Sequence, residues 1–340
     1  MSVSVVWIVP VLVLVAGLQH LVPQLTRPGL FFAVTVSPEF RASSEGRGIL
    51  LRYRLFVWAS TLIAIGAALA GLAWLAILLP MVGYLWGFLH ARHTVLAYAA
   101  AYDQVVEVEL DAPPEGLPGG PIVALLPIAA LAALGGWAAF NLDRLPARMA
   151  VHWGLSGPDA WVTTTSATVF GFLAVYATLC LLLAGVAWGL LHGSRRIATT
   201  GRAAAGERLF RRRLMQLMII MEYLLVCPAV LGLLLPAAPG MTIWGLALTA
   251  VIVVFAILMF RSGQGGTRAA ANGGTAAVGD RTPDACWKLG MFYVNPADPS
   301  ILVEKRFGIG YTVNLGNCWS WAALGAVLVP AALGLIFLRQ

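Results

Sequence analysis

Charged side chains are scarce in this sequence. Asp, Glu, Lys and Arg make up 11% of the 340 residues, whereas hydrophobic residues make up 60%. A soluble domain carries about 25% charged and about 45–50% apolar residues, because its surface must be solvated by water. With a mean hydropathy of +0.84, the chain has too little charge to cover a globule and must be solvated by lipid. The composition therefore excludes a soluble enzyme, a disordered chain and a DNA-binding module built on a basic groove.

Motifs for catalysis and cofactor binding are also lacking. The four cysteines show no zinc-site spacing, and the sequence contains no Ser–His nucleophile pattern, Walker loop or dinucleotide fingerprint. His90 and His93 have a spacing that places two imidazoles on one helical face, but the His-Glu-x-x-His signature of metalloproteases is missing. We therefore expect no cofactor and no enzymatic activity; an intramembrane metal-dependent hydrolase is the weaker alternative.

Long apolar runs, by contrast, recur along the whole chain, and each is long enough to cross the roughly 30 Å hydrocarbon core as a helix. They occupy residues 3–21, 55–89, 121–140, 167–191, 214–235, 241–260 and 319–338. The run 55–89 contains no charge and would be about 52 Å long as a single helix. Its length predicts a hairpin broken near Gly71, with spans over roughly 55–71 and 74–91, and hence eight spans in total.

The distribution of basic residues tests this count independently. With eight spans, one side of the membrane receives segments that hold 19 of the 22 Lys and Arg residues, namely 22–54, 92–120, 192–213 and 261–318. Cytoplasmic loops collect Lys and Arg, so both termini are expected outside. The net charge of +7 is then explained mainly by the excess of Lys and Arg in cytoplasmic loops. The lipid bilayer rather than nucleic acid is the expected partner.

The predicted fold is an all-α polytopic membrane protein with about eight transmembrane helices, both termini outside, and small β-containing cytoplasmic loops. We expect the following regions: a membrane region at 1–140 with four spans and cytoplasmic loops 22–54 and 92–120, an outer loop motif at 141–166, three spans within 167–260, a flexible linker at 261–283, a small cytoplasmic domain at 284–318 and a last span at 319–340.

Short strands are predicted in the loops on the basic side. Apolar and β-branched residues between Pro28 and Pro38 indicate a short strand or an interfacial segment, and the alternating residues 105–110 indicate another strand. Within the domain 284–318, strands are predicted at 292–294, 301–303 and 308–315. Because about 35 residues are too few for a substantial core, we expect this domain to pack on the membrane face or against the first loop.

The outer loop between the fourth and fifth spans has an unusual choice of residues for a connector. Trp153 and Trp161 suit the headgroup zone of a membrane, while His152 and Asp159 are titratable groups beside turns imposed by glycine and proline. One interpretation is an interfacial loop with aromatic anchors and a capping aspartate. The functional hypothesis is that the His152–Asp159 pair binds something polar or senses pH.

Glu222 is a carboxylate within an apolar run. It lies nine residues beyond Arg213, about 13 Å along a helix and therefore near the bilayer midplane. A carboxylate at this depth is costly to bury and is a functional-site hypothesis by default. With Tyr223 beside it, Glu222 is a candidate proton relay or cation ligand, which makes a small proton-coupled transporter or exporter the alternative function. The structural alternative is a protonated Glu222 bonded to a neighbouring span.

Two stretches together resemble a known family. The outer loop, with Leu145-Pro146, His152 and Gly157-Pro158-Asp159, resembles the signature domain of SdpI-like membrane proteins. The stretch 287–314, which contains Trp-Lys-Leu-Gly, Asn-Pro-Ala-Asp-Pro, Val-Glu-Lys-Arg and Gly-Ile-Gly-Tyr-Thr-Val-Asn, is similar to an uncharacterised domain found near the C-terminus of many of the same proteins.

The resemblance implies a bacterial inner-membrane protein. The family's named member gives immunity against a secreted toxic peptide and relays the presence of that peptide by sequestering a transcriptional repressor at the membrane. For this chain, the resemblance implies an outer site that meets an extracellular peptide, formed by His152, Trp153, Asp159 and Trp161. It also implies an inner surface that meets a cytoplasmic regulator, formed by Trp287, Lys288, Asn295, Asp298, Glu304, Lys305, Arg306 and Tyr311.

Overall fold

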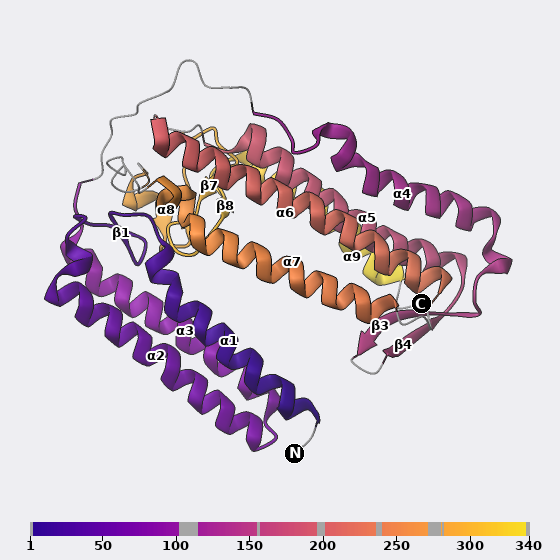
Figure 1. Ribbon diagram of the computed structural model, residues 1–340, viewed down its shortest axis with the longest axis horizontal. Helices are drawn as coiled ribbons and strands as arrows, with labels where there is room; N and C mark the ends of the chain where they lie inside the picture. The colour runs from indigo at the N-terminus through magenta and orange to yellow at the C-terminus, as the bar shows by residue number, and fades with distance from the viewer. Residues whose placement is uncertain are drawn as a thin grey trace.

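The computed structural model describes residues 3–101, 115–154, 157–195, 201–235, 240–270, 280 and 282–337. Its long helices run along the longest dimension of the molecule (Figure 1). They are α1 (Val3–Leu25), α2 (Ser44–Leu69), α3 (Ala73–Val95), α4 (Gly120–Phe140), α5 (Ser166–Trp188), α6 (Gly201–Leu234), α7 (Gly240–Ser262) and α9 (Cys318–Phe337). The seven helices α1–α7 are long and apolar enough to cross a membrane, where a helix satisfies every backbone polar group internally. The chain is therefore a multi-pass membrane protein.

The longest apolar run is divided into two helices, as predicted. Helix α2 ends at Leu69 and α3 begins at Ala73, and Gly71 between them has a φ of 80°. This left-handed conformation is easily adopted only by glycine, so Gly71 permits the tight reversal. The two helices then pack along each other, with the hydroxyl oxygens of Thr61 and Tyr84 2.6 Å apart.

Within the described residues, the strands form four antiparallel hairpins of two strands each. They are β1 (Leu30–Phe31) with β2 (Val34–Thr35), β3 (Arg148–Gly154) with β4 (Gly157–Thr163), β5 (Trp287–Lys288) with β6 (Phe292–Tyr293), and β7 (Leu302–Glu304) with β8 (Tyr311–Val313). The strands predicted in the first loop and the small domain are confirmed, although the first loop forms a hairpin where one strand was predicted. The β3–β4 hairpin was not predicted. The strand predicted at 105–110 lies outside the described residues.

Short helical turns connect these elements. They are η1 (Phe40–Ala42), η2 (Leu96–Tyr98), η3 (Leu142–Arg144), η4 (Gly189–Gly193), η5 (Gln264–Gly266), α8 (Thr267–Ala270) and η6 (Asp284–Cys286).

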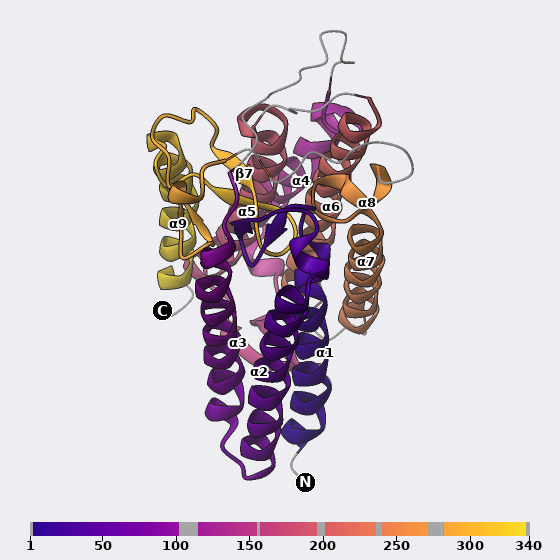
Figure 2. The same ribbon diagram turned by 90° about the vertical axis from the view of Figure 1, so that its left-hand side faces the viewer.

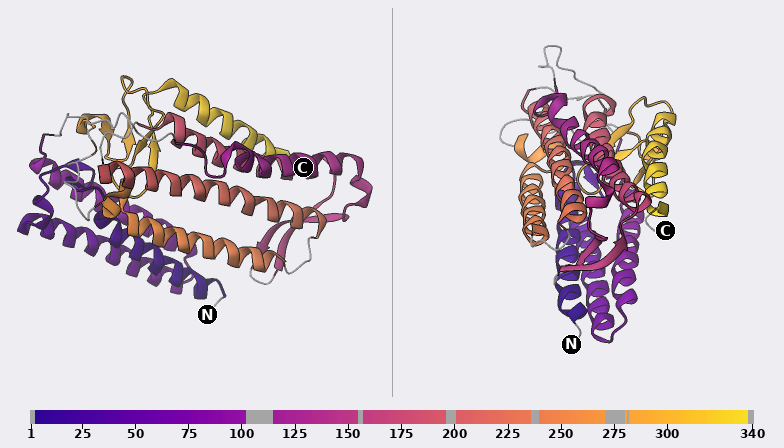
Figure 3. Two further views of the ribbon diagram at one scale, coloured as in Figure 1. Left: turned by 45° about the horizontal axis from the view of Figure 1, so that its top comes forward. Right: turned by 90° about the vertical axis from the view of Figure 1, so that its right-hand side faces the viewer.

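The hairpins lie at opposite ends of the helices. The β1–β2, β5–β6 and β7–β8 hairpins gather with α8 at one end, whereas β3–β4 lies at the other end (Figures 1 and 3). Helix α1 begins, and α9 ends, at the end away from the three gathered hairpins. We call that gathered region the polar cap; it comprises residues 26–43, 192–195, 262–270, 280 and 282–317, together with the helix residues that contact them.

Close packing between the helices falls into two groups. Helices α1, α2 and α3 pack against one another, and α5 packs against α4, α6 and α9, with α7 against α6. Figure 2 shows the first group extending from beneath the cap, with the cap bridging it to the second group. Beneath the first loop, Phe31, Phe32, Tyr53 and Phe88 form a buried core with Val34. The cap is therefore the region where the two helix groups meet.

The described part of segment 261–283 differs from the expected flexible linker. Gln264 is fully buried, and its side-chain amide donates to the Gly310 carbonyl at 2.9 Å and accepts from the Gly310 N–H at 2.8 Å. Gly266 lies so close to the Gly206 backbone of α6 that a Cβ atom would not fit. The small residues of this segment thus serve close packing within the cap.

Candidate functional site: the polar cap and the β3–β4 hairpin

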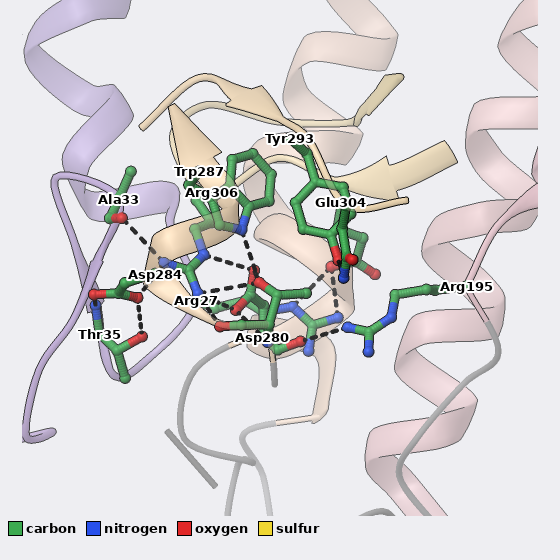
Figure 4. A network of polar contacts seen from close by, with 12 residues as sticks. Arg27, Ala33, Thr35, Arg195, Asp280, Asp284, Trp287, Tyr293, Glu304 and Arg306 are labelled. Atoms are coloured by element: carbon green, nitrogen blue, oxygen red, sulfur yellow. Dashed lines mark hydrogen bonds and ion pairs between the residues drawn. The ribbon is translucent and has the colours of Figure 1, made fainter. Parts of the chain in front are cut away.

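Arg306 is the centre of the polar cap, and its side chain is 0% exposed. The guanidinium donates to the Asp280 carboxylate through Nε at 2.8 Å and Nη2 at 2.9 Å. Through Nη1 it also donates to Asp284 and, at 3.2 Å, to the carbonyl of Ala33 (Figure 4). The ring of Trp287 lies 5.3 Å from the guanidinium carbon. A single buried cation therefore holds together the first loop and both ends of segment 280–306.

Arg306 and Asp280 both remain charged although they are buried. Burial alone would raise the pKa of Asp280, but the Arg306 guanidinium and hydrogen bonds from Thr282 hold that pKa below its ordinary value. A carboxylate that accepts several hydrogen bonds and faces a cation favours its ionised form, so the ion pair is complete at neutral pH.

The small domain packs against the first loop, one of the two placements predicted for it. Thr35 donates to the Asp284 carboxylate through its hydroxyl at 2.8 Å and its N–H at 3.3 Å. The turn between β1 and β2 places Phe32 and Ala33 at φ values of 45° and 63°, a conformation that is strained for residues other than glycine. Arg92 of α3 and Arg306 both donate to the Ala33 carbonyl, which fixes this strained turn.

A second buried arginine joins the first loop to α6. Nε of Arg27 donates to Glu304 of β7 at 2.8 Å, and its Nη2 lies 3.5 Å from the Glu207 carboxylate of α6. Burial on its own would lower the pKa of Arg27, but the Glu304 and Glu207 carboxylates raise it. Tyr311 of β8 is the cross-strand neighbour of Glu304; burial is the main cause that raises the pKa of Tyr311. Arg27 therefore remains charged and Tyr311 neutral.

The eight residues expected to form an inner surface are mostly inside the cap. Trp287, Asp298, Glu304 and Arg306 are buried, Asn295 and Tyr311 are partly buried, and Lys288 and Lys305 are exposed. The carboxylate of Asp298 accepts from the Tyr293 hydroxyl at 3.0 Å and lies 3.4 Å from Arg195. Trp287 contacts Arg306, and Asn295 and Asp298 share the Tyr293 hydroxyl, so these members of the set are parts of the packed cap.

Several residues of the cap were missed by the sequence reasoning. Asn314 is fully buried and donates to the carbonyls of Asn295, Asp298 and Ser300. Arg27, Asp280 and Glu207 form buried ion pairs of the cap, but none of them belongs to a recognisable sequence motif. What the sequence offered was the position of these three residues. Each is a charged residue near an apolar run, and such a charge needs a partner of opposite sign when it is buried in the fold.

The β3–β4 hairpin brings His152 and Asp159 together, as the sequence hypothesis requires. Nδ1 of His152 lies 2.5 Å from a carboxylate oxygen of Asp159, and the two side chains are 69% and 52% exposed. Trp161 on β4 is 43% exposed, while the side chain of Trp153 lies outside the described atoms. The opposite face packs on the bundle, where Met149 shares a core with Phe172 of α5. The hairpin therefore presents a polar, aromatic face away from the helices.

Glu222 is fully buried within α6. Neither of its carboxylate oxygens has a hydrogen-bond partner in the part of the chain that the structure describes, and the Cys180 thiol of α5 lies 3.8 Å from its backbone oxygen. Tyr223 instead donates its hydroxyl to the Val123 carbonyl of α4 at 2.9 Å. Glu222 is thus an isolated buried acid, and Tyr223 is committed to a different neighbour.

The paired histidines of α3 are both exposed. His90 packs its ring 6.0 Å from Phe56, and His93 lies on the same helix near its end. Across residues 3–337, excluding those left undescribed, no group of three or more His, Cys, Asp or Glu side chains is placed to hold a metal ion.

Comparison with known proteins finds a match in the cap. A family of unknown function (DUF5808) matches residues 296–321, which include β7, β8, the central Arg306 and the start of α9. No curated protein and no solved structure matches the chain. The match covers a small part of the chain and carries no assigned activity.

Proposed function

We propose that this chain is an SdpI-like protein of the bacterial inner membrane. Its β3–β4 hairpin recognises an extracellular peptide, and its polar cap relays that event to a cytoplasmic regulator, so that the chain gives immunity or signals. In this proposal α9 is the eighth span, both termini are outside, and the cap is cytoplasmic. Basic residues of the cap, among them Arg27, Arg195 and Arg306, support this orientation.

The observation that carries the proposal is that α6 contacts both the polar cap and the β3–β4 hairpin. The 34 residues of α6 extend about 51 Å as a helix. At one end Glu207 faces Arg27 in the cap, and near the other end α6 contacts β3, with Leu233 in the same core as Met149. Because α6 touches both sites, it gives a physical path by which a displaced hairpin shifts the Arg27–Glu207 contact.

The two polar sites differ in a way that suits a receptor and an output. His152, Asp159 and Trp161 are exposed and available for direct contact with a peptide. In the cap, Glu304 and Arg306 are buried, so a regulator would respond to a rearrangement of the cap rather than touch these groups in their resting state.

Toxin challenge of a sensitive bacterial host tests the proposal. Cells expressing the wild-type chain should tolerate a secreted peptide that kills the parent strain, and a His152→Ala/Asp159→Ala variant should lose that tolerance while still reaching the membrane. Arg27→Gln should break the link to α6 and abolish capture of the regulator at the membrane. Unchanged tolerance and capture in both variants would show that neither site has its proposed role.

A second candidate function rests on Glu222. A fully buried carboxylate without a partner on the described chain suits a group that takes up and releases protons during transport. Proteoliposomes containing the wild-type chain should then show proton flux, followed with a pH-sensitive dye, that Glu222→Gln abolishes and Tyr223→Phe retains. Equal flux in wild-type and Glu222→Gln proteoliposomes would remove Glu222 from any transport mechanism.

A further inference from the structure

The tip of the β5–β6 hairpin combines backbone strain with apolar exposure. Leu289 has a φ of 53°, in the left-handed region that branched and bulky residues avoid. Its side chain is 56% exposed, and that of Phe292 across the turn is 48% exposed. Glycine or asparagine would relieve the strain and remove the exposed surface, so a leucine at this position calls for a partner that covers it.

The depth of this tip indicates what the partner is. A Cβ atom on Gly290, the residue after Leu289, would lie 3.0 Å from Cδ of Arg92 and 2.9 Å from Cβ of Ala33. Arg92 stands six residues before the end of the apolar span Trp74–Tyr98, which is about 9 Å along the helix. The hairpin tip therefore lies beside the last turns of a helix that is long and apolar enough to cross a membrane.

The surroundings of the tip agree with this depth. Figure 2 shows the small domain between the cap ends of α3 and α9, and both Trp319 and Trp321 at the start of α9 are exposed. Tryptophan is enriched where a membrane meets water. Lys288 is exposed next to Leu289, and its ammonium donates to the Ala285 carbonyl at 3.0 Å; a cation beside an apolar tip suits contact with lipid phosphates.

We propose that Lys288, Leu289 and Phe292 form a lipid-binding tip. Leu289 and Phe292 insert into the leaflet on the cap side, and Lys288 faces the headgroup phosphates. Gly290, next to Leu289, packs against Arg92 of α3, a helix long and apolar enough to cross a membrane, so the occupant is phospholipid. Lipid contact at this tip anchors the small domain to the bilayer through β5 and β6.

Spin-label accessibility in nanodiscs tests the proposal on the full chain. With the native Cys180, Cys227, Cys286 and Cys318 replaced by alanine, a nitroxide is attached at Leu289→Cys or, as the matched control, at the exposed Lys305→Cys. The nanodiscs contain phosphatidylglycerol and phosphatidylcholine. The Leu289 label should collide with oxygen several-fold more often than with a water-soluble nickel chelate, and the Lys305 label should show the reverse. Nickel access at position 289 equal to that at 305 would overturn the proposal and leave the tip open to a soluble partner.

A second variant separates lipid contact from folding of the hairpin. Asparagine tolerates the left-handed conformation, so Leu289→Asn should keep the turn while removing its apolar side chain. A nitroxide at Phe292→Cys should then show at least a twofold fall in its oxygen-to-nickel collision ratio when Leu289→Asn is introduced. An unchanged ratio would mean that Leu289 does not hold the tip in lipid, and the proposal would fail.

Discussion

At the residue scale, the cap depends on two buried arginines that each join separate parts of the chain. Arg306 connects the first loop with Asp280 and Asp284, and Arg27 connects the first loop with Glu304 and α6. Removing one partner of a buried ion pair is costly because the remaining charge is left uncompensated. Stability and coupling of the cap are therefore concentrated in few side chains.

Arg306→Ala should destabilise the cap by about 3–5 kcal/mol, since Asp280 and Asp284 lose their buried counter-charge. Thermal unfolding in nanodiscs, together with limited proteolysis of residues 280–317, measures the effect. The neighbouring Lys305→Ala is the control, because Lys305 is exposed and should change stability by less than about 0.5 kcal/mol. Similar losses in the two variants would contradict the role of Arg306.

The cap should lose stability in acid through Asp280 and in strong alkali through Tyr293. The pKa of Asp280 is lowered in the fold, so its stabilisation is complete above its unfolded pKa of about 3.9 and is lost as pH falls through the lower folded pKa. Burial raises the pKa of Tyr293 to about 12, so its stabilisation is present below about pH 10 and is lost towards pH 12.

Melting curves of the wild-type chain from pH 3 to pH 8 measure this dependence. The melting temperature should fall below about pH 4, and Asp280→Asn should remove most of that fall. An equally large fall in Asp280→Asn would show that another group controls the acid limit of the cap.

The exposed pair on the hairpin should contribute to recognition rather than stability. Because the His152 and Asp159 side chains are 69% and 52% exposed, their ion pair is worth about 0–1 kcal/mol at most. Asp159→Asn should leave the melting temperature within a few degrees of the wild type and abolish peptide tolerance. A large loss of stability would assign Asp159 a structural role instead.

At the scale of elements, the spans could be predicted and the hairpins only in part. Apolar runs determine helices in lipid because no other open structure satisfies the backbone there, and Gly71 supplied the break between α2 and α3. Strands of two or three residues have little intrinsic stability and depend on distant partners, such as Arg27 and Glu304, which are 277 residues apart. The local sequence around a short strand does not reveal such long-range contacts.

The missed β3–β4 hairpin has a similar cause. On β4, the half-buried residues are Pro158, Ala160 and Val162, which alternate with exposed residues. The sequence contains this period of two, but the aromatic and turn residues around it favoured a loop. The contact between His152 and Asp159 forms at a register shift of this hairpin, where His152 is opposite Ala160 and Trp153 is opposite Pro158; the sequence hypothesis did not specify this hairpin. The candidate pair was thus predicted, and its scaffold was not.

Gly290 tests how the β5–β6 hairpin docks on the first loop. Gly290 and Gly71 have φ values of 74° and 80°, but a Cβ atom would meet Ala33 and Arg92 only at Gly290, and nothing within 4 Å at Gly71. Both Gly→Ala variants should lose about 1–2 kcal/mol from backbone strain. Gly290→Ala should also separate the small domain from the first loop and increase proteolysis at 280–317. Equal proteolysis in the two variants would show that close packing at Gly290 does not matter.

At the scale of the whole molecule, a polar site lies at each end of a long apolar bundle. Two groups of helices meet at the cap (Figure 2), and α6 extends from the cap to the β3–β4 hairpin. Among the charged groups that the structure describes, Arg27, Asp280, Glu304 and Arg306 lie in the cap, and His152 and Asp159 lie on the hairpin. Communication between the two ends requires that they face opposite sides of the membrane.

Cysteine labelling of right-side-out spheroplasts tests that requirement most directly. Single cysteines are introduced at the exposed positions Thr163 of β4 and Lys305 of the cap, in a chain whose native cysteines are replaced by alanine. A membrane-impermeant maleimide should label Thr163→Cys in intact spheroplasts, and Lys305→Cys only after the membrane is permeabilised. Labelling of both positions in intact spheroplasts, or of Lys305→Cys alone, would contradict a hairpin outside and a cap inside, and with it the proposed relay.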